Sequence, residues 1–169
     1  MQKLYLDCDG VILDTINRSY IMLKELGITA EPQITEFYSK LNWEKLIKES
    51  GEINNSISKI KELSKYFDIE ILTHINSEDE VRVKLEYFKE KLPGIKVITV
   101  PKPIKKADFV VPKGVILVDD YNSNLDYWYE KGGIPIKFSD SGKENKYTAI
   151  TDLLDLLQLD FNTKVKVKE

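Results

Sequence analysis

The stretch LYLDCDGVILDT, from Leu4 to Thr15, decides the predicted fold. A short apolar run ends at Asp7, and a second carboxylate, Asp9, follows two positions later in front of Gly10. Apolar runs of this length, bounded by polar or turn-forming residues, are typical of buried strands, so a strand is predicted near residues 3–6. Two acids placed directly after a buried strand indicate a site at the end of that strand.

Composition restricts the class of protein. The chain has 169 residues, 42% of them hydrophobic and 31% charged, which predicts one globular domain with a real core. The net charge is −3 without a basic patch, so polymeric nucleic acid is not an expected partner. One cysteine and one histidine exclude an internal disulfide and a zinc cluster. The sequence shows neither a signal-peptide pattern nor a long apolar run, so no membrane association and a cytoplasmic location are expected.

Strand-like runs alternate with helical segments along the chain, a pattern that predicts an α/β fold: a Rossmann-like parallel sheet with helices on both faces. Further strands are predicted at 69–72, 96–100, 115–118 and 134–136, the last an edge strand because of Pro135. The segment KKADFVV is predicted to be a short strand or a turn, and 148–159 a helix.

Two helices are predicted together with their buried faces. The helix over 14–26 would stop at Gly27. A second helix would begin after Ser77, which forms a capping-box pattern with Glu80. Helical spacing assigns to the two buried faces Ile16, Tyr20, Leu23 and Leu26 in the first helix, and Val81, Leu85, Phe88 and Leu92 in the second.

The segment between the first two strands is longer than a crossover needs. It contains no convincing strand and shows the pattern of several short helices. We therefore expect a single domain with a core of about 1–15 and 66–160 and a small helical cap insertion of about 16–65.

Polar residues stand where apolar strands stop, at Asp7, at Thr73 and at the pair Asp119-Asp120. The carboxyl ends of parallel strands share one edge of a sheet, so these side chains are expected to meet there. Carboxylates gathered in this way repel one another unless a cation lies among them. Oxygen ligands in small number suit Mg²⁺, which is the predicted cofactor.

Such an arrangement suits phosphoryl transfer. One aspartate attacks phosphorus as a nucleophile, and a second, reached through the turn that Gly10 allows, moves the proton. A hydroxyl at a strand end and a lysine would hold the remaining phosphate oxygens. The helix after Ser77 would add backbone N–H groups that point at the anion.

These motifs together resemble those of the haloacid dehalogenase (HAD)-like hydrolases. DCDGVILDT is similar to the first motif of that superfamily, ILT at Thr73 to the second, Lys105 or Lys106 to the third, and ILVDD at Asp119-Asp120 to the fourth. The four motifs occur in order and cover the chain from residue 4 to about 138.

The resemblance implies a role for each matching residue. Asp7 would be the nucleophile and Asp9 the acid/base. The implied metal ligands are Asp7, the backbone carbonyl of Asp9, and Asp120, with Asp119 close behind. Thr73 and a lysine would bind phosphate. Lys106 is the first choice for this lysine and Lys105 the second. Lys113 is set aside, because it is predicted to lie in a turn too close to the strand. Further candidates for the phosphate site are Gly10 and His74.

Within the superfamily, KAD and VILVDDYNSNLDYW resemble the 5'(3')-deoxyribonucleotidase branch. This narrower resemblance implies a nucleoside monophosphate as substrate, with Trp43 and Tyr38 of the cap as candidate contacts. Where that branch often has an arginine after the acidic pair, this chain has Tyr121-Asn122, which leaves the substrate open.

Two alternatives remain. The substrate could be a sugar phosphate or another small phosphoester. The protein could also be a non-hydrolytic phospho-acceptor or binding protein, although receiver domains have their acidic pair near the first strand and their acceptor aspartate in the middle. Cys8 is expected to be a small buried residue and not a thiol nucleophile, since no arginine follows it closely.

Overall fold

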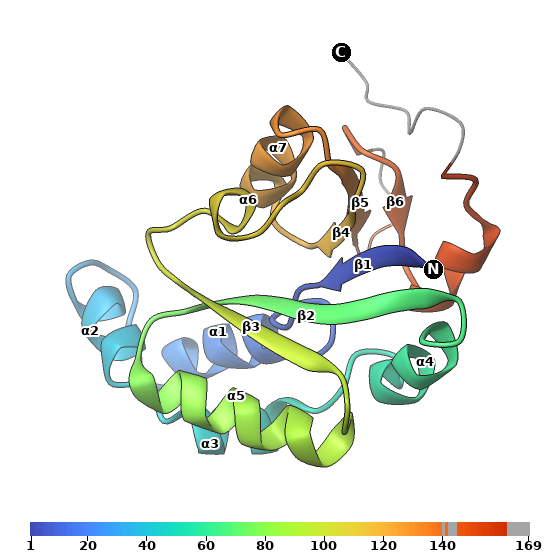
Figure 1. Ribbon diagram of the computed structural model, residues 1–169. Helices are drawn as coiled ribbons and strands as arrows, with labels where there is room; N and C mark the ends of the chain where they lie inside the picture. Colours follow the sequence, from blue (N-terminus) through green and yellow to red (C-terminus); the bar gives the residue numbers. More distant parts are fainter. Residues whose placement is uncertain (140, 142–144, 162–169) are drawn as a thin grey trace.

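The computed structural model describes residues 1–139, 141 and 145–161 (Figure 1). Between β1 and β2 the chain forms only helices; afterwards strands and helices alternate up to β5 (Figure 1). The elements in chain order are β1 (Gln2–Leu6), α1 (Thr15–Glu25), α2 (Gln33–Ser39), α3 (Trp43–Ser50), α4 (Ser56–Leu63), β2 (Phe67–Ile75), α5 (Glu78–Lys91), β3 (Lys96–Pro101), α6 (Lys106–Phe109), β4 (Ile116–Asp119), α7 (Asn122–Glu130), β5 (Ile134–Phe138), β6 (Ala149–Ile150) and the 3₁₀ helix η1 (Leu153–Gln158).

The six described strands form one parallel sheet in the order β3-β2-β1-β4-β5-β6. Helices α4 and α5 lie on one face, and α6 and α7 on the other (Figure 1). The predicted Rossmann-like fold is confirmed. The strand order reverses at β1, which has β2 on one side and β4 on the other. In open parallel sheets, ligands bind outside the carboxyl ends of the strands at this switch point.

Side chains that alternate in direction along the strands divide the core between the two faces of the sheet. Leu4 and Leu6 are fully buried with Phe88 of α5, whereas Tyr5 contacts Trp128 of α7, their ring centroids 5.7 Å apart. Each such fully buried leucine contributes about 2 kcal/mol of transfer free energy. Because successive side chains in a strand point to opposite faces, Asp7 follows Tyr5 toward the face that α6 and α7 cover.

The predicted run of short helices before β2 is confirmed as α2, α3 and α4. Helix α4 packs against η1, and its residues Ile57, Ile60 and Leu63 are part of the core. Helix α2, in contrast, projects beyond the carboxyl ends of the strands and has no buried residue (Figure 1). The division into a core of 1–15 and 66–160 and a cap of 16–65 stays a prediction.

Three predicted elements differ in the structure. The strand 134–136 is not the edge of the sheet, because β6 pairs with β5 through Lys137 and Phe138. That pairing begins after Pro135, so the missing N–H of the proline interrupts no ladder. Instead of one helix, 148–159 forms β6 and η1, because the Asp152 and Asp155 side chains close a capping box that starts a new helix. KKADFVV contains the short helix α6.

The predicted buried faces of two helices were wrong in part. In α1, Leu23 is buried, but Ile16 and Tyr20 are 40% and 61% exposed. In α5, Phe88 is buried and Leu85 is 41% exposed. Both helices are rotated so that polar side chains point inward: Thr15 and Ser19 in α1, and Glu80 and Lys84 in α5.

Among the described helices, none is both long enough and apolar enough to cross a lipid bilayer.

Gly133 lies where no larger residue fits. A methyl group there would overlap the indole ring of Trp128, which is held in place because its N–H donates to the Val115 carbonyl at 2.8 Å. We predict that Gly133→Ala lowers the free energy of unfolding by about 2–3 kcal/mol through overpacking, measured by urea titration. In the control Gly114→Ala nothing lies within 4 Å, and its φ of +73° should cost only about 1 kcal/mol. Equal losses in the two variants would contradict the packing argument.

Candidate active site

Three carboxylates converge at the switch point of the sheet. Asp7 follows β1, Asp119 ends β4 and Asp120 comes next, and one oxygen of each lies within 4.8 Å of the others. Asp119 shares the face of Asp7, because it follows Leu117 by two positions and Leu117 contacts the same core as Tyr5. The predicted meeting of these acids at one edge is therefore what the fold produces.

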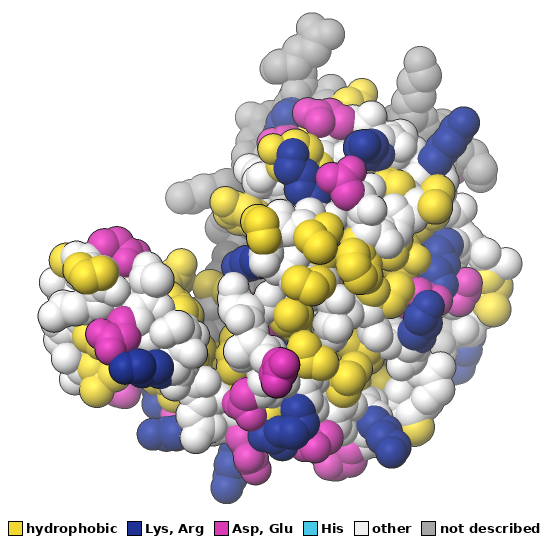
Figure 2. Space-filling model, turned by 60° about the vertical axis from the view of Figure 1, so that its left-hand side comes forward, with side chains coloured by type: hydrophobic (Ala, Val, Ile, Leu, Met, Phe, Trp, Pro, Cys, Tyr) yellow, Lys and Arg dark blue, Asp and Glu magenta, His cyan; other side chains and the backbone are white. Residues whose placement is uncertain are grey.

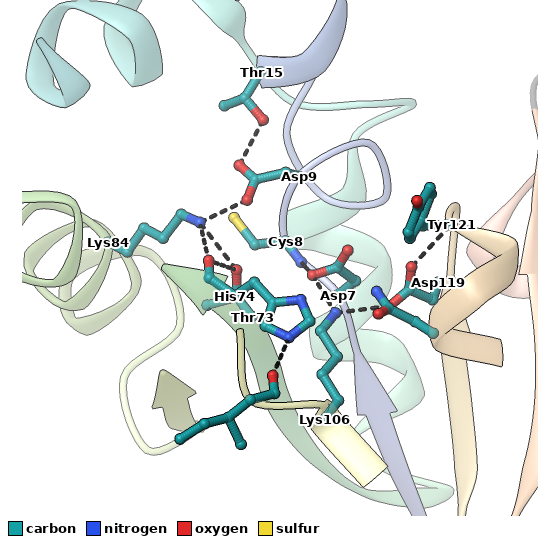
Figure 3. A network of polar contacts seen from close by, with 12 residues as sticks. Asp7, Cys8, Asp9, Thr15, Thr73, His74, Lys84, Lys106, Asp119 and Tyr121 are labelled. Carbon is teal, nitrogen blue, oxygen red and sulfur yellow. Dashed lines mark hydrogen bonds and ion pairs between the residues drawn. The ribbon is translucent and has the colours of Figure 1, made fainter. Parts of the chain in front are cut away.

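Lys106 is the cation of this cluster (Figure 3). Its Nζ atom lies 2.8 Å from Asp7 Oδ1 and 2.7 Å from Asp119 Oδ2, and its side chain is 1% exposed. Burial alone lowers the pKa of a lysine, but the charges of Asp119 and Asp7 outweigh it and raise the pKa of Lys106. Lys105 turns away, with its Nζ 3.2 Å from the ring centroid of Tyr127. Lys113 lies in the turn before β4.

Asp119 is held from three directions. Besides Lys106, its carboxylate accepts the backbone N–H of Tyr121 at 2.9 Å and the side-chain amide of Asn124 at 3.0 Å. Asp119 thus fixes both the lysine and the start of α7.

Asp7 and Asp120 carry unfavourable negative charge. Burial, followed by the charge of Asp119, raises the pKa of Asp7 well above its usual value, although Lys106 opposes the change. The same two causes raise the pKa of Asp120 to about 6. When all three carboxylates are ionised, they exceed the single ammonium of Lys106 by two negative charges.

A tight turn at Gly10 brings Asp120 close to the first motif. The backbone N–H groups of residues 11–13 all donate to the Cys8 carbonyl, and Gly10 has φ +79°, a conformation that favours glycine. A side chain at Gly10 would also overlap the Asp120 carboxylate. Gly10 therefore allows the close approach rather than supplying a side-chain contact. Cys8 is fully buried, as predicted, and burial raises the pKa of its thiol.

Asp9 lies in a different environment from Asp7, although only one residue separates them (Figure 3). Its Oδ1 accepts the Thr15 hydroxyl at 2.6 Å, and its Oδ2 lies 2.6 Å from Lys84 Nζ. Burial by itself would raise the pKa of Asp9, but the charge and hydrogen bond of Lys84 outweigh it and lower the pKa. Its carboxylate is not part of the three-acid cluster.

The β2 residues lie between these two groups of acids. Thr73 is fully buried, and its hydroxyl accepts a hydrogen bond from Lys84 at 3.0 Å. His74 Nε2 contacts the Ile104 carbonyl at 2.8 Å, so the ring is tied to the loop before α6. Burial and the nearby Lys106 lower the pKa of His74.

The N-terminus of α5 is closed by its own side chains. Ser77 accepts the N–H of Glu80 at 3.1 Å, as the predicted capping box requires. The Glu80 carboxylate, however, accepts the N–H of Asn76 at 2.7 Å and pairs with Lys84. Glu80 therefore faces inward and connects the cap of the helix to the buried lysine.

The two candidate substrate contacts lie elsewhere. Trp43 is 7% exposed and packs in the core, with Lys84 Nζ 4.7 Å from its ring centroid. The Tyr38 hydroxyl bonds to Ser19 Oγ at 3.1 Å. A cavity of about 690 Å³ opens beside Asp120 instead, and among its lining residues are Gly10, Asp14, Ile16, Asn17, Tyr20 and Glu52. Neither Trp43 nor Tyr38 lines it.

Apolar side chains gather on the face of the molecule in front of the strand ends (Figure 2). In the loops that border the site, Ile104 is 43% exposed and Tyr121 is 64% exposed. The Tyr121 backbone N–H is bonded to Asp119, so its side chain starts beside the acidic cluster (Figure 3).

Sequence reasoning missed Lys84, Thr15, Asn124 and Lys137, whose Nζ donates to the Asp120 carbonyl. The available signal for Lys84 was Glu80 four positions earlier, a spacing that places both on one face of a helix. On an exposed helix the same spacing is ordinary, so it could not identify a buried pair.

No protein-family model and no curated protein sequence matches this chain. Solved structures do. A putative HAD hydrolase from Bacillus subtilis, bound to magnesium, is similar with a TM-score of 0.63 and 12% identity over 93% of this chain and 97% of that chain. A HAD-superfamily hydrolase of subfamily IA from Geobacter sulfurreducens gives a TM-score of 0.61 and 10% identity, with coverages of 94% and 98%.

A haloacid dehalogenase-like hydrolase from Streptococcus pneumoniae is similar to the same extent, with a TM-score of 0.60, 16% identity and coverages of 94% and 97%. At these identities the likeness concerns the fold. The chain has the α/β fold of the HAD-superfamily hydrolases, and none of these three similar structures is described as a deoxyribonucleotidase.

The donor set fits a hard divalent cation. Asp7 and Asp120 offer carboxylate oxygens, and the excess of two negative charges equals the charge of one Mg²⁺. Burial and the charge of Asp119 raise the pKa of both acids, and a bound cation would oppose both effects. A histidine or thiol site for a softer metal is not formed, because Cys8 is buried away and His74 is bonded to the backbone.

The two adjacent lysines allow a matched comparison. We predict that Lys106→Met, in metal-free buffer at pH 7, lowers the free energy of unfolding by about 3 kcal/mol, because two buried carboxylates lose their partner. Lys105→Met removes only an exposed cation from the face of Tyr127 and should cost less than about 1 kcal/mol. Urea titrations of the two variants measure the difference. Similar losses would contradict the assignment of Lys106 as the buried cation.

Proposed function

We propose that this protein is a Mg²⁺-dependent phosphomonoesterase that acts through an aspartyl-phosphate on Asp7. The observation that carries the proposal is the separation of two neighbouring acids into two environments. Asp7 lies in a charge-excess cluster with Lys106, and Asp9 is held apart by Lys84 and Thr15. Two carboxylates in contrasting surroundings are what a nucleophile and a proton carrier need.

Asp7, Asp120 and the backbone carbonyl of Asp9 would hold the ion, with Asp119 behind them. Bound Mg²⁺ would neutralise part of the negative charge on the transferred phosphoryl group. Lys106 Nζ, 2.8 Å from Asp7 Oδ1, is placed to attract a phosphate oxygen beside the nucleophile. The Thr73 hydroxyl, buried in β2 two residues before the strand ends, would donate to another.

In the first half-reaction an Asp7 oxygen forms a bond to phosphorus while the bond from phosphorus to the ester oxygen breaks. The leaving alkoxide takes a proton from the Asp9 carboxyl and departs as an alcohol. A bound phosphate dianion favours the protonated form of Asp9, since like charge raises the pKa of a carboxyl group.

In the second half-reaction Asp9, now a carboxylate, accepts a proton from water as the water oxygen bonds to phosphorus. The bond from phosphorus to the Asp7 oxygen breaks, which restores the Asp7 carboxylate and releases inorganic phosphate. The sum is one ester and one water converted to one alcohol and one phosphate.

Asp9 also favours a phosphoester over a haloacid as substrate. A halide leaves as a stable anion and needs no proton, whereas an alkoxide does. In dehalogenation a carboxylate held by Thr15 and Lys84 two residues after the nucleophile would keep only the second of its two tasks, accepting a proton from water.

For the organic part of the substrate we propose a small polar metabolite, with a nucleoside monophosphate as first choice and a sugar phosphate as alternative. The cavity of about 690 Å³ beside Asp120 is large enough for either. Its lining combines the exposed Tyr20 and Ile16 with the polar side chains of Asn17 and Glu52, which suits a ring that carries hydroxyl groups.

Substitution of the nucleophile tests the mechanism. We predict that Asp7→Asn abolishes phosphate release, by at least about 10³-fold in kcat, because an amide oxygen does not form the aspartyl-phosphate. The control Asp108→Asn changes a half-exposed surface carboxylate that pairs with Lys131 and should keep full activity. Phosphate release is measured with p-nitrophenyl phosphate. An active Asp7→Asn variant would eliminate the mechanism.

Metal removal tests the Mg²⁺ requirement, and a substrate panel tests the reaction and the substrate class. EDTA should stop turnover and Mg²⁺ should restore it, because the three-acid cluster then regains its balancing charge. A panel of deoxynucleoside monophosphates, sugar phosphates and chloroalkanoates is then followed by phosphate and chloride release. Release of chloride without phosphate would overturn the proposed reaction, and phosphate release confined to sugar phosphates would select the alternative substrate.

A further inference from the structure

Lys84 is a fully buried cation in the middle of the candidate site (Figure 3). Its Nζ lies 2.6 Å from Asp9 Oδ2, 2.8 Å from Glu80 Oε1, 3.0 Å from Thr73 Oγ1 and 3.2 Å from the His74 carbonyl. Four acceptors surround three N–H donors, so each donor has a partner.

These contacts fall into two classes. Glu80 belongs to the same helix as Lys84, is 1% exposed, and is itself fixed by the N–H of Asn76 at 2.7 Å. The pair of Glu80 and Lys84 is therefore a rigid unit of α5 with its charges balanced. Asp9 comes from the loop after β1 and Thr73 from β2, and both are residues to which the proposed reaction gives a task.

The position of Lys84 is also defined from the opposite side. Trp43 of α3 covers it, with the ring centroid 4.7 Å from Nζ. Helix α3 comes from the segment between β1 and β2, and α3 and α5 pack together. The ammonium cannot move far without losing either this contact or the Glu80 pair.

The consequence for Asp9 is geometric. Lys84 holds one carboxylate oxygen and Thr15 holds the other, each at 2.6 Å, which fixes the plane of the carboxylate. Each oxygen keeps a second lone-pair site that can carry the transferred proton. The Thr73 hydroxyl accepts from Lys84 at 3.0 Å and donates to the His74 carbonyl at 3.3 Å, so a bound phosphate oxygen would take the place of that carbonyl as the acceptor.

We propose that Lys84 is a positioning residue for phosphoryl transfer, which orients Asp9 toward the leaving group and Thr73 toward the phosphate. This inference rests on the proposed function. Lys84 reaches the reacting atoms only through these two side chains, and its partner Glu80 provides the rigid support.

The test compares two esters in Mg²⁺. p-Nitrophenyl phosphate releases an acidic phenol that needs little proton donation, whereas glycerol 2-phosphate releases an alcohol that depends on it. Lys84→Met keeps the length of the side chain and removes the ammonium. We expect kcat to fall at least about 100-fold on glycerol 2-phosphate and only about tenfold on the nitrophenyl ester, with KM within about threefold.

A double variant separates positioning from stability. Lys84→Met leaves Glu80 buried without its cation and should lower the melting temperature. Lys84→Met with Glu80→Gln removes the unpaired charge and should recover most of that melting temperature while kcat on glycerol 2-phosphate stays low. Arg82→Met, on the exposed side of the same helix, should change neither quantity.

The outcomes are distinct. Equal losses on the two esters that recover together with the melting temperature in the double variant would overturn the positioning role and leave the proposed function intact. Absence of turnover by the unsubstituted protein on both esters would reject the proposed function, and the role of Lys84 with it.

Discussion

Repulsion among acids at the carboxyl edge of the sheet is the constraint on which the rest of the site depends. Asp7, Asp119 and Asp120 lie within 4.8 Å of one another because β1 and β4 are neighbours whose carboxyl ends meet. If only acids lay at this edge, they would take up protons or their repulsion would destabilise the folded state. Lys106 balances part of the charge from the buried side and leaves the remainder facing the space where a cation and a phosphate would bind. The site is therefore stabilised internally, yet it stays incomplete with respect to charge.

A second lysine explains how two aspartates two positions apart acquire different properties. The Gly10 turn redirects the chain, so that Asp7 remains on the side of Lys106 while Asp9 reaches Lys84 and Thr15. The charge of Asp119 adds to burial in raising the pKa of Asp7, and Lys84 reverses the effect of burial at Asp9. These shifts favour the protonated form of Asp7 and the ionised form of Asp9, so the proposed roles rest on the different partners of the two acids and on a bound cation, which would favour the ionised form of Asp7.

Much of this arrangement could be predicted from local pattern. The strands and the acids at the ends of β1 and β4 follow from short apolar runs that stop at polar residues, a signal that requires no knowledge of tertiary structure. The predicted stop at Thr73 was wrong, because β2 continues to Ile75 and keeps its pairing with β3. The buried faces of α1 and α5 could not be predicted from helical spacing, because that method assumes that the inward side of a helix is apolar. Here the inward side carries Thr15 and Lys84, which both donate to Asp9, and Lys84 also pairs with Glu80. The strand β6 and the helix η1 were missed for a different reason, since the capping box at Asp152 interrupts a run that otherwise has helical spacing.

The rotation of α1 that places Thr15 inward also explains why two residues predicted to be buried line the cavity beside Asp120. When Thr15 turns inward to bond Asp9, Ile16 and Tyr20 are carried to the outside, where an apolar residue gains nothing from folding. They are exposed beside Asp120, on the wall of the cavity, and not on an arbitrary part of the surface. One helix thus supplies a polar group to the acid/base candidate and apolar contacts to whatever fills the cavity. A helix that departs from its hydrophobic pattern where both of its displaced faces border one site is expected at a functional site, because local rules are broken there more often than elsewhere in a fold.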